Sequence, residues 1–274
     1  MEWAQSGVLA LARGVRDPVS LMAAVPPGAP PSLLNAQTTP GRSVGFVSVR
    51  RTHVQTIARH LGVGIDAVCL SLLSQSLNLY LAERGAAPQR SLVAALLEPG
   101  MRSARAPDGT TRSEEPGLAI DCVPLASDAP SASERVARIE EALRYAGLDR
   151  SATWEPLVSP LLDATPPALL VGLGDLVGRV EAAGALPRFA NVLYSSSEEA
   201  AEMSYLAGAR IQNRYVFAPS APGLPLHVHA TVRPASVDFG LSACRDSIPD
   251  LWSLTMGLST ALSDSLDELG LRDD

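Results

Sequence analysis

The fold is decided by the stretch from Tyr205 to Trp252, which reads YLAGARIQNRYVFAPSAPGLPLHVHATVRPASVDFGLSACRDSIPDLW. Apolar residues alternate with polar ones from 224 to 232, and the alternation resumes from 237 to 243 after Pro234-Ala235-Ser236. A period of two predicts an antiparallel hairpin with one face buried. Asp250 is placed to open a closing helix after the hairpin.

Helices and strands alternate along the rest of the chain. Strands are expected at residues 44–50, 92–97, 118–125, 189–194 and 211–217, and helices at residues 52–60, about 66–84, 134–146, 168–183 and 251–269. Polar residues with Pro and Gly predict a mobile loop at 101–117, and the run at 195–199 predicts a solvated turn. This order predicts an α/β fold with a mixed sheet flanked by helices.

Local signals mark the ends of several helices. The helix beginning near Asp66 has apolar residues at spacings of three and four, which is typical of burial along one face, and Gly85 is placed to end it. Ser131-Ala132-Ser133-Glu134 has the spacing of a capping box. Before the last helix, Asp246 is expected to cap the turn and Arg245 to pair locally.

The N-terminal region differs in composition from the rest. Residues 1–24 carry apolar side chains at spacings of three to five, which predicts an amphipathic helix. Residues 25–42 contain five prolines and are expected to form an extended linker. We therefore divide the chain into an N-terminal helix and linker, 1–42, and one domain, 43–274.

Composition narrows the class of protein. Of the 274 residues, 46% are hydrophobic, which is enough for a sizeable core. A net charge of −7 argues against nucleic acid as a partner. Cys69, Cys122 and Cys244 are far apart among apolar neighbours, so we expect buried thiols in a reducing cytoplasm. No signal peptide and no transmembrane segment are expected.

The stretch from Tyr205 to Asp250 resembles the C-terminal half of the bacterial wax ester synthase/diacylglycerol acyltransferase family, within the CoA-dependent acyltransferase superfamily. The resemblance extends more weakly back to about Leu33. It implies one half of a chloramphenicol acetyltransferase-like two-domain fold. It also implies transfer of an acyl group from acyl-CoA to an alcohol or diacylglycerol, with acyl-CoA as substrate and no cofactor.

The catalytic motif that this resemblance implies, His-His-x-x-x-Asp-Gly, belongs to the N-terminal half and is absent here. The reaction needs a histidine because a base with a near-neutral pKa must remove the proton of the alcohol. None of the four histidines, His53, His60, His227 and His229, begins His-x-x-x-Asp. We assign no catalytic residue, and we expect the chain to begin at the linker between the two halves.

Three positions match altered family motifs, and the resemblance implies that they bind substrate. Asp66-Ala67 stands where the family has Asn-Asp, and Asn191-Val192-Leu193-Tyr194-Ser195 stands where it has Asn-Val-Pro-Gly-Pro. Met101-Arg102 matches the end of Pro-Val-Ser-Met-Arg, and Arg102 could neutralise a CoA phosphate. The alternatives are that Asp66 only favours a helix N-terminus and that Arg102 is only exposed.

His227 and His229 are two residues apart on one predicted strand, so both point to the same polar face, beside Thr231 and Arg233. They could contact a ligand, act as a base or hold a metal. A metal would need a third ligand, for which Asp238 is the obvious candidate, and we assign no metal site. The default interpretation is a strand surface that faces solvent or an interface.

Two classes of function remain open. The chain could be half of an O-acyltransferase for wax ester or triacylglycerol synthesis, working with a separate N-terminal half or as a homo-oligomer. It could instead be a catalytically inactive module that binds acyl-CoA or lipid, or a scaffold. A further possibility is an independent hydrolase or transferase built on His227. We expect it in the cytoplasm, with association to a membrane or lipid-droplet surface through the N-terminal helix.

Overall fold

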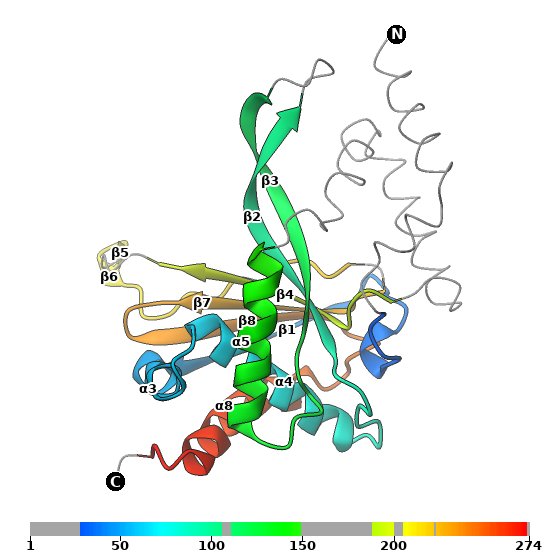
Figure 1. Cartoon of the computed structure of the whole chain (residues 1–274), viewed down its shortest axis with the longest axis vertical. Coiled ribbons are helices and arrows are strands. Elements are labelled where there is room, and N and C mark those ends of the chain that lie inside the picture. The colour runs from blue at the N-terminus through cyan, green and yellow to red at the C-terminus, as the bar shows by residue number, and fades with distance from the viewer. Residues whose placement is uncertain (1–27, 106–110, 149–187, 200–204, 222, 273–274) are drawn as a thin grey trace.

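The computed structural model describes residues 28–105, 111–148, 188–199, 205–221 and 223–272. Its centre is a six-stranded mixed sheet with helices packed against one face (Figure 1), which confirms the predicted fold class. In sheet order the strands are β1 (Arg42–Arg50), β8 (Ser236–Cys244), β7 (Leu226–Val232), β4 (Val192–Glu198), β2 (Val93–Arg105) and β3 (Thr111–Pro124). The helices are α3 (Arg51–Leu61), α4 (Ile65–Ala82), α5 (Ala132–Leu148) and α8 (Leu251–Glu268).

The predicted hairpin is present as β7 and β8. Its turn is closed by a hydrogen bond from the Arg233 N–H to the Ser236 carbonyl, 2.8 Å long. The expectation of one buried face is wrong, because every residue of β7 is buried, as is all of β8 after Ser236. The helices cover one face of this hairpin. The segment 211–220, where a strand was expected and none forms, lies over the other face, with Val216 against Gly240.

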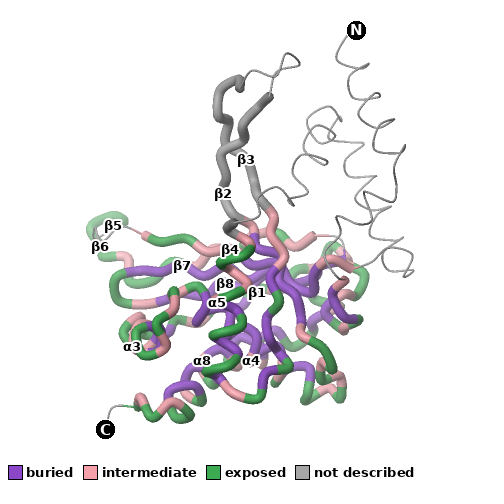
Figure 2. Tube along the Cα trace, viewed as in Figure 1, coloured by how far each residue is buried: buried purple, intermediate pink, exposed green. Residues whose placement is uncertain are grey.

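The central helix is α4. It packs against α8 and α5 and is buried on nearly all sides, including Ser71, Ser74 and Ser76, so the expectation of a single buried face is wrong. Figure 2 shows buried residues around α4 and along the central strands of the sheet. By length and hydropathy α4 could cross a membrane, but 67% of it is buried inside the domain. That burial is what we expect of a core helix.

A long hairpin replaces the predicted loop at 101–117. β2 and β3 pair from Val93↔Pro124 out to Arg105↔Thr111, and the hairpin projects beyond the rest of the sheet (Figure 1). In the sequence, the Pro107-Asp108-Gly109 signal falls between the described ends of the two strands. The polar composition was misleading because antiparallel strands can pair with one face open to water, and such strands need fewer apolar residues.

The predicted solvated turn at 195–199 is also wrong. β4 continues through Glu198, parallel to β7, with Ser195 opposite His229. Glu199 then donates its N–H to the Val232 carbonyl, 2.9 Å away. The serine run therefore belongs to the sheet, where it can meet the side chains of β7.

The helix boundaries mostly agree with the sequence signals. The Ser131 hydroxyl accepts from the Glu134 N–H, as the capping box predicts, and Gly62 ends α3 in the left-handed conformation. Asp250 caps α8 by accepting from the Ser253 N–H. Asp246 is not that cap: it accepts from the Thr39 hydroxyl, 2.6 Å away.

Other predictions have mixed outcomes. Arg245 donates to the backbone of Arg42, 3.0 Å away. The predicted helices at 1–24 and 168–183 lie outside the described residues. Within the expected linker, Leu33–Asn35 forms one 3-10 turn and Leu34 is buried. Tyr205–Leu206 and Ala209–Arg210 form a separate small hairpin, β5 and β6.

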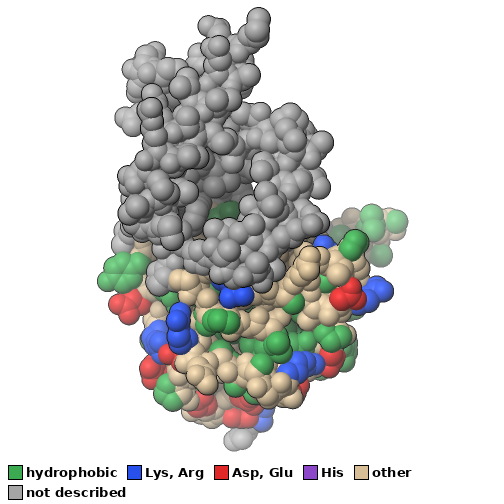
Figure 3. Space-filling view, turned by 90° about the vertical axis from the view of Figure 1, so that its right-hand side faces the viewer, with side chains coloured by type: hydrophobic (Ala, Val, Ile, Leu, Met, Phe, Trp, Pro, Cys, Tyr) green, Lys and Arg blue, Asp and Glu red, His purple; other side chains and the backbone are tan. Residues whose placement is uncertain are grey.

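The described surface carries charges of both signs. Figure 3 shows acidic and basic side chains interspersed with apolar ones over the described part of one face, with no single block of either sign there. Large apolar side chains are exposed on β1, at Val44 and Phe46, and on α8, at Trp252 and Met256. The net negative charge is therefore not gathered in one patch on the face shown.

Candidate functional site

The sheet forks close to the start of α4. β2 pairs with β4 only from Ala94↔Val192 to Leu96↔Tyr194 and then continues with β3 alone. β4 instead stays paired with β7 as far as Glu198. The two strands therefore separate, and a pocket opens where they part.

This fork pocket has a volume of about 260 Å³. Its apolar wall comes from α4, α5 and β2, and its polar groups come from the first turn of α4, from α5 and from β4. The lining residues are Gly64, Asp66, Ala67, Leu70, Leu96, Leu97, Glu140, Leu143, Tyr194, Ser195 and Ser196. An apolar wall with a few polar groups is the usual form of a small-molecule site.

Asp66 lies in the first turn of α4 and lines the fork pocket. The start of the helix is held by Glu140 of α5, which accepts from the Gly64 N–H at 3.0 Å. Asp66 keeps contact with solvent, yet partial loss of water around it raises the pKa of its carboxyl. A hydrogen bond with Ser196 opposes this rise, and the charge of Glu198 adds to it.

Replacing Asp66 with asparagine is expected to raise the melting temperature slightly at neutral pH and to flatten its pH dependence. Because the folded-state pKa lies above the unfolded value, the stability contributed by the protonated carboxyl is complete below that unfolded value. It is lost as pH rises through the folded-state pKa. Melting curves of both proteins from pH 4 to 8 measure this. Parallel curves for the two proteins would contradict it.

His227 and His229 converge on one serine hydroxyl. The Ser195 Oγ is 3.0 Å from His227 Nε2 and 2.7 Å from His229 Nδ1. The Ser197 Oγ is 3.0 Å from His229 Nε2, and the Pro219 carbonyl oxygen is 2.9 Å from His227 Nδ1. The histidines are only 3% and 9% exposed. They share a face, as predicted. Of the default interpretation, a surface facing solvent or an interface, the solvent-facing alternative is wrong because both side chains are buried.

The surroundings favour neutral imidazoles. Burial lowers the pKa of both His227 and His229; the Pro219 carbonyl opposes this for the first, and the neighbouring His227 strengthens it for the second. The suggested third metal ligand, Asp238, is engaged elsewhere, accepting from Ser48 and from the Arg214 N–H. Among the described residues, no group of three or more His, Cys, Asp or Glu is placed to hold a metal ion.

Asn191 lies away from the fork pocket and has a full set of partners. It is fully buried, and its Oδ1 accepts from the Val93 N–H at 2.9 Å. Its Nδ2 donates to the Pro30 carbonyl at 2.8 Å and to Asn35 Oδ1 at 2.7 Å. The side chain thus ties β4 to β2 and to the segment before β1. For Arg102, the structure describes a backbone position on β2 opposite Glu115.

Sequence reasoning missed the two serines that bond Asp66 and the histidine pair. Ser196 bonds Asp66, and its neighbour Ser195 bonds the two histidines, so adjacent residues of β4 serve opposite faces of the sheet. Tyr194, also in the pocket wall, is buried with its hydroxyl beside the Cys69 thiol. Consecutive serines after an apolar run were the available signal, but they were interpreted as a turn.

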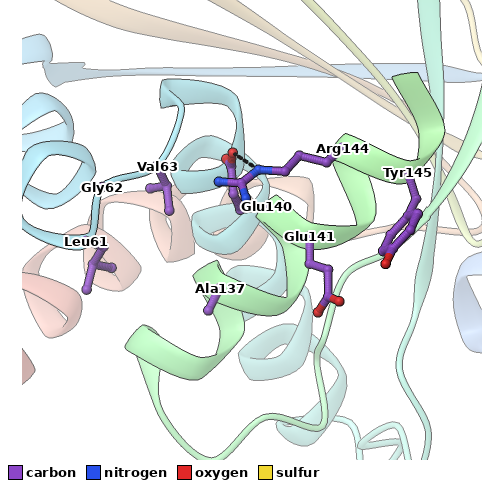
Figure 4. Close-up of a pocket in the computed structure, with 8 residues that line it drawn as sticks. All are labelled: Leu61, Gly62, Val63, Ala137, Glu140, Glu141, Arg144 and Tyr145. Atoms are coloured by element: carbon purple, nitrogen blue, oxygen red, sulfur yellow. Dashed lines mark hydrogen bonds and ion pairs between the residues drawn. The ribbon is translucent and has the colours of Figure 1, made fainter. Parts of the chain in front are cut away.

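A wider pocket, whose lining residues are drawn in Figure 4, shares Glu140 with the fork pocket. It has a volume of about 540 Å³ and lies between the turn that joins α3 to α4 and the exposed side of α5. Its lining residues are Leu61, Gly62, Val63, Ala137, Glu140, Glu141, Arg144 and Tyr145. Glu140 lines both pockets and accepts from Arg144 Nε at 3.2 Å. Of this ion pair, Glu140 lines both pockets and Arg144 lines only the wider one.

Comparison with known families identifies the family of this chain. The WS/DGAT C-terminal domain matches residues 122–265, slightly more than half of the chain. The chain belongs to the wax ester synthase/diacylglycerol acyltransferase family. A Mycobacterium tuberculosis protein named as a putative diacylglycerol O-acyltransferase is 29% identical over 275 residues, covering 93% of this chain and 52% of that protein. A second from that organism, named tgs2, is 24% identical over 259 residues, covering 90% and 52%.

Solved structures agree on the fold. The wax ester synthase/diacylglycerol acyltransferase from Marinobacter aquaeolei VT8 aligns over 98% of this chain and 57% of its own, with a TM-score of 0.68 and 20% identity. A condensation domain of the enacyloxin polyketide synthase aligns over 93% and 47%, with a TM-score of 0.53 and 13% identity. The chain thus spans about half the length of the family members that it matches.

Proposed function

We propose that this chain is the C-terminal half of an O-acyltransferase that moves an acyl group from acyl-CoA to an alcohol or diacylglycerol. The observation that carries the proposal is the position of Asp66. It stands where the family has the first residue of its Asn-Asp motif, and it lines a pocket with an apolar wall. Such a pocket suits an aliphatic chain with one polar end.

The roles of the residues follow from the reaction. A base must remove the alcohol proton so that its oxygen can attack the thioester carbonyl, after which CoA leaves as the thiol. The His-His-x-x-x-Asp-Gly base is not in this sequence, so we assign it to an N-terminal half outside these 274 residues. Asp66 and Ser196 would hold the polar group of a substrate, while Leu96 and Leu143 contact its chain.

A specific observation favours a second candidate, an inactive module that binds acyl-CoA or lipid. The family's Asn-Val-Pro-Gly-Pro turn is replaced by Asn191-Val192-Leu193-Tyr194-Ser195, and β4 runs through these positions from Val192 without a break. A turn that prolines and glycine would fix is absent from this part of the chain. The pocket would then still bind its ligand, but the chain would not contribute to a catalytic site.

The experiment combines the chain with the N-terminal half of the 29% identical Mycobacterium tuberculosis relative. Long-chain acyl-CoA and hexadecanol are supplied, and the ester product is measured by mass spectrometry. We expect ester only from the combination. Asp66→Ala should lower its rate by about tenfold or more, the factor for a lost hydrogen bond to a charged group. Glu141→Gln, on the exposed side of α5, is the matched acidic control.

The possible results separate the two candidates. Ester formed by this chain alone would show that no second half is needed. A stable complex that binds acyl-CoA but forms no ester would support the inactive module. Failure of the complex to form calls for the same assay with the half from the Marinobacter protein, and a second failure there would count against the two-half proposal.

A further inference from the structure

The hydrogen bonds around Ser195 have one consistent set of directions when both imidazoles are neutral. Pro219 offers a carbonyl oxygen, which only accepts, so the hydrogen of His227 is on Nδ1 and its Nε2 is an acceptor. That Nε2 accepts the Ser195 hydroxyl proton over 3.0 Å. The Ser195 oxygen accepts in turn from His229 Nδ1 over 2.7 Å. His229 Nε2 is then free to accept from Ser197.

With these directions, one lone pair of Ser195 has no partner among the residues that the structure describes. A hydroxyl has one donor hydrogen and two acceptor lone pairs. The hydrogen goes to His227, and one lone pair receives the N–H of His229. Ser195 is also partly exposed and lines the fork pocket, whereas both histidines are buried. Ser195 is the first residue of β4 beyond its pairing with β2, so it borders the fork pocket at the open edge of the strand, while its hydroxyl faces the histidines.

We propose that Ser195 is an acyl-accepting nucleophile, with His227 as its base, that reacts with activated acyl compounds such as thioesters and aryl esters. The Ser195 oxygen forms a bond to the carbonyl carbon, and its proton passes to His227 Nε2. The bond from that carbon to the thiolate or aryloxide breaks, and the leaving group takes the proton from Nε2. Water then cleaves the acyl-serine ester, which releases a carboxylic acid and restores the hydroxyl.

The two histidines have different roles in this step. The Pro219 carbonyl orients the His227 ring so that Nε2 faces Ser195, as the third group of a catalytic triad does. The His229 N–H stabilises the serine oxygen as its proton leaves. A carbonyl oxygen carries less negative charge than a carboxylate, so the His227 imidazolium is only weakly stabilised. Turnover should be slow, and covalent capture is the better readout.

The test treats the purified 274-residue chain with an alkyl fluorophosphonate and follows its mass. We expect a single phosphonyl adduct, located on Ser195 by peptide mapping, and none in Ser195→Ala. His227→Gln should slow labelling about 100-fold, the usual loss when a general base is removed. Ser242→Ala is the matched control, because Ser242 pairs with His227 across β7 and β8 and is outside this hydrogen-bonded set. It should label at the wild-type rate.

Peptide mapping of the labelled wild-type chain tests the proposal even if a variant fails to fold. Absence of label on the folded wild-type chain, or label on a different residue, would overturn the proposal. Equal labelling rates in wild-type and a folded His227→Gln protein would remove His227 from the role of base. Only this chain and the reagent are involved, so a negative result leaves the O-acyltransferase proposal, which is measured by ester product with a second half, unaffected.

Discussion

Replacing Gly240 with alanine is expected to destabilise the domain by about 3 kcal/mol, because it overpacks a contact between two backbones. A Cβ at this position would overlap the carbonyl oxygen of Val216, and the carbonyl carbon and the amide nitrogen of Val216 are also close. Backbone atoms cannot rotate aside as a flexible side chain does. The segment 211–220 would have to lift from β8, and with it Pro219, which orients His227.

The measurement is chemical denaturation of Gly240→Ala beside wild type, with hydrogen exchange at β7 as the local probe. Gly41→Ala is the matched control, because a Cβ there meets its nearest neighbours, Arg245 and Thr39, at 3.7 and 3.8 Å, ordinary contact distances. We expect that control to be close to neutral. A Gly240→Ala protein as stable as the control would mean that the segment over β8 is not packed as the structure shows.

The sequence predicted the hairpin well and its environment poorly, for one physical reason. Alternation identifies which residues share a face, so Val228 and Phe239 were correctly placed in the core. It does not say whether the polar face meets water. Here the polar face is covered, and its groups bond one another: Asp238 accepts from Ser48, and His227 meets Ser195. Buried polar groups that satisfy each other look like a solvated face in a sequence.

The candidate site shows the same limit. Asp66 and the histidine pair could be found from a helix start and from i, i+2 spacing. Ser195 could not, because its importance depends on a parallel pairing between β4 and β7 that joins residues 32 and 34 positions apart. The fork pocket likewise depends on where β2 leaves β4. Non-local strand pairing is what single-sequence patterns do not specify.

Replacing Asn191 with alanine is expected to cost about 3 to 4 kcal/mol, since a fully buried side chain loses three hydrogen bonds and the Val93 N–H is left without its acceptor. The Pro30 carbonyl and Asn35 Oδ1 lose a donor at the same time. Asn35 keeps its own bonds to the Ala190 and Gly223 carbonyls, so the segment before β1 should loosen and not detach completely. Thermal unfolding and limited proteolysis near residue 30 measure the two effects.

Asn191→Asp keeps the shape of the side chain but removes its two hydrogen-bond donors, so it tests which of the two matters at this position. Aspartate keeps an oxygen for the Val93 N–H, but its second oxygen would face the Pro30 carbonyl and the Asn35 side-chain oxygen with no hydrogen to give. An ionised carboxylate among buried acceptors is costly, so this variant should be at least as unstable as Asn191→Ala at neutral pH and should recover partly on acidification. Wild-type stability in both variants, together with loss of ligand binding, would instead place Asn191 in substrate binding.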